Sequence, residues 1–256
     1  MTKIGKEGRL AATAVIVRDR PGARPDILMV ERAGSMAFAA GALVFPGGAV
    51  DPADLELARE IAGPADVEET AARLAAIRET LEESGLGVGF VTPPDQARVA
   101  EMRAALGEGA SLAALVRAHR LELALDQLVP FSRWHPAMAE NVSRVFDTRF
   151  YVVRAPAGQE ASADLTENVR LFWGSAQETI ARCDAGQGRI IFPTRRNLER
   201  LALFASFEEM AAHAATIPVE KIRPWVEERD GQRHLCIPDH LGYPVTSEPW
   251  TRVSRG

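Results

Sequence analysis

Residues 78–86 read Arg-Glu-Thr-Leu-Glu-Glu-Ser-Gly-Leu, and the run Phe45-Pro46-Gly47-Gly48 lies upstream of them. On an α-helix, Glu79, Glu82 and Glu83 stand at i, i+3 and i+4 and therefore share one face. The opposite side carries the apolar residues Leu74, Ile77 and Leu81. Arg78 falls at the edge of the acidic arc, so we expect no cation among the three carboxylates.

Like charges at this spacing destabilise a helix by roughly 0.2–0.5 kcal/mol per pair. A hard divalent cation, which takes oxygen ligands, would offset that repulsion. The alternative interpretation is a solvated acidic face that ends at a glycine cap, with Gly85 as the residue after the helix.

The combination of Arg-Glu-x-x-Glu-Glu-x-Gly-Leu with Phe-Pro-Gly-Gly resembles the signature of the Nudix hydrolases, and it favours the metal-binding interpretation. The signature covers residues 45–86. The resemblance implies an α+β fold, an α/β/α sandwich with a mixed sheet. It also implies hydrolysis of a nucleoside diphosphate linked to another moiety, with Mg²⁺ or Mn²⁺ as cofactor.

Roles for site residues follow from the same resemblance. Glu79, Glu82 and Glu83 would bind the metal, with Glu79 and Glu83 also catalytic, and which of them is the general base stays open. Arg78 would orient these carboxylates, and the carbonyl of Gly47 would complete the metal shell.

Further candidates lie outside the acidic helix. We assign Phe45 and Gly48 to substrate binding. Arg32 either holds a substrate phosphate or belongs to a plain surface loop. Glu167 is either a further ligand or base, or a solvated loop residue.

The chain departs from the family pattern between the two halves of the signature. Gly48 stands thirty residues before Arg78, an insertion of sixteen residues relative to the family spacing. Thr70 occupies the position where the family usually has a glutamate. Glu69 and Asp51 are the two candidates to replace it.

The substrate class is indicated only by short segments. Phe-Pro-Gly-Gly-x-x-Asp, the interrupted signature and residues 144–151 resemble the coenzyme A diphosphatase-like branch, so we favour coenzyme A or acyl-coenzyme A. ADP-ribose, NADH and dinucleoside polyphosphates are the alternative substrates. A Nudix-fold ligand-binding or regulatory module without turnover is the alternative function.

Composition limits the classes of partner. The chain has 256 residues and a formal net charge of −5, which argues against nonspecific binding to nucleic acid or to an anionic membrane. Its two cysteines lie far apart, so neither a disulfide framework nor a zinc site is expected. Neither a signal-peptide core nor a run of about 20 apolar residues is present, and we expect a cytoplasmic protein with a small-molecule nucleotide substrate.

The pattern of elements predicts one domain over residues 1–256. Residues 10–17 and 27–31 should form a strand hairpin, and residues 42–45 a strand that Pro46–Gly48 ends. The main helix should run over about residues 67–84, with a capping box of Asp66 and Glu69. A helical insertion at about residues 93–127 would form a lid or a homodimer contact. Residues 217–256 would form a C-terminal arm with a hairpin turn at Asp230-Gly231.

Overall fold

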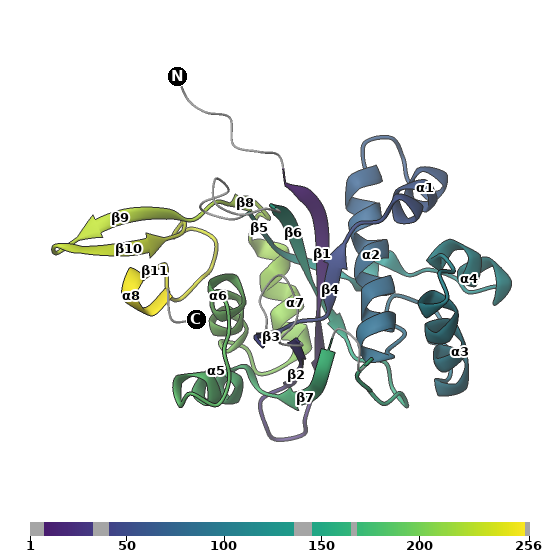
Figure 1. Ribbon diagram of the computed structural model, residues 1–256, viewed down its shortest axis with the longest axis horizontal. Helices are drawn as coiled ribbons and strands as arrows, with labels where there is room; N and C mark the ends of the chain where they lie inside the picture. The colour runs from purple at the N-terminus through teal and green to yellow at the C-terminus, as the bar shows by residue number, and fades with distance from the viewer. Residues whose placement is uncertain (1–7, 33–40, 136–144, 165–167, 254–256) are drawn as a thin grey trace.

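The computed structural model describes residues 8–32, 41–135, 145–164 and 168–253. A central mixed sheet lies between two groups of helices (Figure 1). Its strands are β1 (Arg9–Arg18), β2 (Asp26–Arg32), β3 (Leu43–Val44), β4 (Gly47–Ala49), β5 (Val129–Trp134), β6 (Phe146–Arg154), β7 (Asn168–Gly174) and β8 (Lys221–Ile222). They are ordered β3-β2-β1-β6-β5-β8, with β4 beside β1 and β7 beside β2. The predicted hairpin of β1 and β2 is present.

The middle strand β1 is buried on both faces of the sheet. Ala14 and Ile16 join one hydrophobic cluster, whereas Val15 and Val17 join the other. Because side chains alternate across a strand, a strand covered on both faces reads as a continuous apolar run. The run at residues 10–17 therefore forms the centre of the sheet, with β6 parallel to it and β2 antiparallel.

Helices cover both faces of this sheet. In Figure 1, α1 to α4 lie to the right of the sheet and α5 to α7 to the left. The first group comprises α1 (Pro52–Ile61), α2 (Val67–Ser84), α3 (Gln96–Gly107) and α4 (Leu112–Ala118), with a 3-10 turn at Leu125–Gln127 after it. The second comprises α5 (Ala176–Asp184), α6 (Phe192–Leu201) and α7 (Phe207–Thr216). This arrangement confirms the predicted α/β/α sandwich.

The acidic helix α2 has the predicted bounds. Gly85 ends it in the left-handed conformation, with φ 64° and ψ 29°, and its N–H donates to the carbonyl of Leu81. The predicted capping box at its start is wrong, because the side chain of Asp66 caps no backbone N–H. Glu69 instead accepts hydrogen bonds from Arg73 and from the hydroxyl of Tyr151.

The segment after Phe45 also differs from the prediction. The predicted strand ends before Pro46, as β3 over Leu43–Val44 beside β2, but Gly47 and Gly48 then begin a further strand that was not predicted, β4, which pairs antiparallel with β1. Thr13 lies opposite Gly47, and a Cβ on Gly47 would be 2.4 Å from the carbonyl oxygen of Ala12. The glycine is therefore required by the close approach of two backbones.

The C-terminal arm forms a second, smaller sheet. It contains β9 (Trp225–Arg229), β10 (Gln232–Cys236) and β11 (Ser247–Pro249), followed by α8 (Trp250–Val253). The predicted hairpin is present, and its turn residues Asp230 and Gly231 have φ values of 50° and 73°, as tight hairpin turns require. Buried Tyr243 attaches the arm to the main body by donating to Asn197 on α6.

No helix within the described ranges has both the length and the apolar character that a membrane crossing requires.

Asp147 joins three strands of the sheet. It is 3% exposed on β6, and both of its oxygens accept hydrogen bonds of 2.8 Å from Arg133 on β5. Lys221 on β8 lies 2.6 Å from Oδ2. Burial alone would raise the pKa of Asp147, but these two cations outweigh it and lower the pKa to about 2.

We expect Asp147→Asn to destabilise the protein at pH 7 by about 1–2 kcal/mol, because a low folded-state pKa stabilises the fold above the unfolded pKa of about 3.9. That contribution is lost as the pH falls toward 2. Urea denaturation at pH 7 and pH 3 measures it, and the deficit of the variant should be smaller at pH 3. Asp184→Asn, which alters an exposed pair with Arg195, is the matched control and should cost less. An equal Asp147→Asn deficit at both pH values would contradict this account.

Candidate active site

Two carboxylates of α2 lie against the backbone of β4. Glu83 is 4% exposed, and its Oε2 accepts a hydrogen bond of 2.9 Å from the N–H of Gly47. A Cβ on Gly48 would lie only 2.3 Å from Oε1 of Glu79. The two glycines therefore let the acidic face of the helix approach the strand. Gly48, predicted to bind substrate, makes room for the carboxylate of Glu79.

Arg78 lies among the carboxylates, contrary to the sequence-based expectation. It is 7% exposed, and its Nη1 donates to Oε1 of Glu79 at 2.8 Å and to Oε2 of Glu82 at 3.2 Å. Nη2 donates to the carbonyl of Ala49 on β4. The Cα of Arg78 is at the edge of the arc, but its long side chain carries the guanidinium into it. Arg78 thus contacts two of the three carboxylates, those of Glu79 and Glu82.

A fourth carboxylate, that of Asp54, reaches Arg78 from α1. Its Oδ2 lies 3.0 Å from Nη2, and both oxygens accept from Nε at 3.3 Å. Glu69 is not the replacement for the family's missing glutamate, because it binds Arg73 and Tyr151 instead. Asp51 is also a weaker candidate, since its Oδ2 is 3.7 Å from Nη2 and its side chain is 47% exposed.

The site carries a surplus of negative charge. Burial raises the pKa of Glu79 to about 8; the charges of Glu83 and Glu82 add to this effect, whereas Arg78 opposes it. Burial likewise raises the pKa of Glu82, again opposed by Arg78. Both shifts arise chiefly from burial, and a cation bound beside these carboxylates would favour their charged forms and lower both pKa values.

The donor chemistry of the site fits a hard divalent cation. Glu79, Glu82 and Glu83 offer only oxygen atoms, which Mg²⁺ and Mn²⁺ prefer. Within the described part of the chain, however, no three His, Cys, Asp or Glu side chains already form a metal-binding group. The carboxylates of Glu79 and Glu82 accept hydrogen bonds from Arg78.

The remaining predicted residues lie elsewhere. Phe45 is 3% exposed and packs edge-to-face on Phe150, with ring centroids 6.3 Å apart, so its side chain belongs to the core. Arg32 is half-buried at the end of β2, and its Nε has no hydrogen-bond partner in the described structure. Glu167 lies outside the described residues.

Besides Asp54, sequence reasoning missed Arg103 on α3. Its guanidinium donates to the carbonyls of Glu82 and Glu83 and to the hydroxyl of Ser162. Carbonyls at the end of a helix lack partners within it and carry partial negative charge, so a cation there is favourable. The inserted helix α3 therefore supports the C-terminal end of α2. Arg103 is one of two arginines in α3, and the sequence gave no signal that it has this role.

Comparisons with known proteins agree with this architecture. No protein-family model matches the chain. A NUDIX hydrolase from Alicyclobacillus acidocaldarius is 27% identical, with a TM-score of 0.69 over 81% of this chain and 96% of the other. A MutT NUDIX hydrolase from Burkholderia pseudomallei is 19% identical over 76% of this chain and 98% of the other, with a TM-score of 0.42. The similarity to the Alicyclobacillus acidocaldarius structure shows that the chain has the fold of the Nudix hydrolases.

Proposed function

We propose that the chain is a divalent-metal-dependent pyrophosphohydrolase that cleaves the diphosphate linkage of a nucleoside diphosphate derivative. The observation that carries this proposal is the meeting of Glu79 and Glu83 at the Gly47-Gly48 backbone, with Arg78 and Glu82 beside them. These residues are the ones that the Nudix signature assigns to metal binding and catalysis, and they come together on the fold of the Nudix hydrolases.

The chemistry follows from this arrangement. A bound Mg²⁺ or Mn²⁺ would screen the phosphate charge and lower the pKa of a water ligand. Glu79, Glu82 and Glu83 would hold the ion, and one of the carboxylates takes the proton of the attacking water. The water oxygen forms a new bond to one phosphorus as the bridging P–O bond breaks, so two phosphate-terminated products leave. Arg78 keeps two of the carboxylates in place during this exchange.

For the substrate we propose coenzyme A or acyl-coenzyme A, on the resemblance of residues 45–51 and 144–151. Two charged residues of the second segment serve internal pairs: Asp147 binds Arg133, and Arg149 lies 3.2 Å from Glu69. This segment therefore fixes the sheet and the start of α2.

Product analysis by mass spectrometry tests the proposed substrate. The protein is incubated with coenzyme A, acyl-coenzyme A, ADP-ribose, NADH and diadenosine polyphosphates, each with Mg²⁺, Mn²⁺ or chelator.

Metal-dependent release of 4′-phosphopantetheine and 3′,5′-ADP would support both the reaction and the substrate. Cleavage of another compound would keep the reaction and reject coenzyme A. The second candidate is a Nudix-fold ligand-binding module without turnover, which the interrupted signature, with Thr70 in place of the usual glutamate, favours. Binding of a nucleotide without cleavage under every metal condition would select it.

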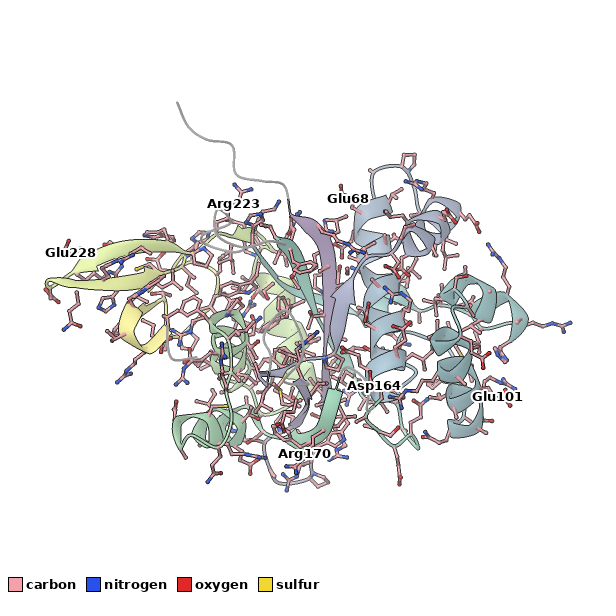
Figure 2. The ribbon with its side chains drawn as sticks, in the orientation of Figure 1. Glu68, Glu101, Asp164, Arg170, Arg223 and Glu228 are labelled. Carbon is pink, nitrogen blue, oxygen red and sulfur yellow. The ribbon has the colours of Figure 1, made fainter. Side chains whose placement is uncertain are left out.

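We expect Glu83→Gln to lower metal-dependent kcat by at least about 100-fold. Glutamine keeps an oxygen that can accept from the Gly47 N–H, so the fold should stay intact while the charge is lost. Steady-state kinetics and circular dichroism measure the two effects. Glu101→Gln, the same change on the outer side of α3, is the control and should be neutral (Figure 2). Full activity of Glu83→Gln would remove the central assignment.

We expect Gly48→Ala to weaken Mn²⁺ binding about 10-fold with little change in melting temperature. The new methyl group would collide with the carboxylate of Glu79, the flexible end of a side chain, and so displace a ligand without disturbing the backbone. Electron paramagnetic resonance titration of Mn²⁺ measures the affinity. Gly107→Ala is the control, because a Cβ there meets nothing within 4 Å. Unchanged Mn²⁺ affinity in Gly48→Ala would show that this contact does not shape the site.

A further inference from the structure

The insertion between β4 and α2 brings a buried carboxylate to the candidate active site. Asp54 belongs to the first turn of α1 and is 2% exposed. Its oxygens contact Nε and Nη2 of Arg78, at 3.0–3.3 Å. A buried carboxylate needs a partner of opposite charge. A guanidinium that faces the carboxylate with one edge supplies both the charge and the hydrogen bonds.

Local structure fixes the position of Asp54 before Arg78 is considered. Pro52 starts α1, and the N–H of Asp51 donates to Oδ2 of Asp54 at 2.9 Å. Leu57 and Ala58 lie three and four residues further on the same buried face and pack into the core beside α2. The carboxylate is thus held by the helix start and by the packing of α1.

The contacts of Arg78 divide its guanidinium into two sides. Nε and Nη2 bind Asp54, and Nη2 also donates to the carbonyl of Ala49. Nη1 is left for Glu79 and Glu82. Because the guanidinium is planar and rigid, fixing one edge also fixes the direction of the other nitrogen.

We propose that Asp54 is a positioning residue of the active site: it locks Arg78 so that Arg78 orients the carboxylates of Glu79 and Glu82. Asp54 acts only through Arg78. The inserted helix α1 therefore supplies the carboxylate that an uninterrupted signature would carry on the acidic helix itself, where this chain has Thr70. The expected effect of Asp54 on catalysis rests on the proposed function. Its expected effect on cation binding does not, because cation affinity can be measured without turnover.

The full-length protein and its Asp54→Asn variant test the proposal by electron paramagnetic resonance titration with Mn²⁺ alone. We expect the variant to bind Mn²⁺ about 10-fold more weakly. Asp54→Glu, which keeps the charge, should bind within about threefold of wild type. Glu56→Gln, which removes an exposed carboxylate from the same helix α1, is the matched control and should match wild type. Wild-type affinity in Asp54→Asn, or equal losses in the Asn and Glu variants, would overturn the proposal.

A double-mutant cycle separates positioning from a general structural role. If Asp54 acts through Arg78, Asp54→Asn should have no further effect on Mn²⁺ affinity in an Arg78→Lys background. Additive losses in the double variant would overturn the proposal, because they would mean that Asp54 acts by another route.

Kinetics distinguish this inference from the proposed function. With a cleaved substrate, Asp54→Asn should lower kcat about 10-fold or more with KM within about twofold, since Asp54 is buried against Arg78. A wild type that cleaves, beside an Asp54→Asn variant with unchanged kcat and Mn²⁺ affinity, would refute the positioning role alone. A wild type that binds Mn²⁺ but cleaves nothing would refute the proposed function, and the Mn²⁺ titrations would still decide the role of Asp54. A wild type that binds no Mn²⁺ would overturn both.

Discussion

The ion-pair network around Arg78 is the interaction on which the site depends. A helix that turns Glu79 and Glu83 toward a neighbouring strand removes their charges from water, and burying unpaired carboxylates costs several kcal/mol. Arg78 offsets part of that cost, because its guanidinium stays charged even when buried. One positive charge does not balance four carboxylates, and the pKa of Glu79 is raised, chiefly by burial and further by the charges of Glu83 and Glu82.

Local sequence signals predicted those elements that local interactions determine. Helix α2 was predicted with its observed bounds, because helix-forming residues fill it and Gly85 can adopt the left-handed conformation that ends it. Strand β4 was missed, because Gly47 and Gly48 are poor strand residues that pair only where β1 offers a backbone partner. The capping box failed for a similar reason, since Tyr151 and Arg149 on β6 draw Glu69 away.

The residues of the candidate site also fall into two groups: those whose proximity follows from local sequence and those that only the fold brings together. The spacing of Glu79, Glu82 and Glu83 is a property of one helix, so the sequence alone placed them together. Their pairing with Arg78 was missed, because a helical projection shows where a side chain starts and not where a long one ends. Asp54 was missed because it is far from Arg78 in the chain and lies within an insertion that only the fold brings back to α2.

The segment with α1 and the segment with α3 and α4 both lie on the α2 side of the sheet (Figure 1), and the charges of α2 explain why they are useful there. A helix carrying repelling carboxylates is weakest where those charges gather, near its C-terminal end, where the partial negative charge of the helix dipole adds to them. Arg103 of α3 binds the carbonyls at that end, and Asp54 of α1 fixes Arg78 one turn earlier. Support from two separate segments lets α2 keep its charges close together, which is the arrangement that a divalent cation requires. The insertions are therefore part of what makes the acidic face possible.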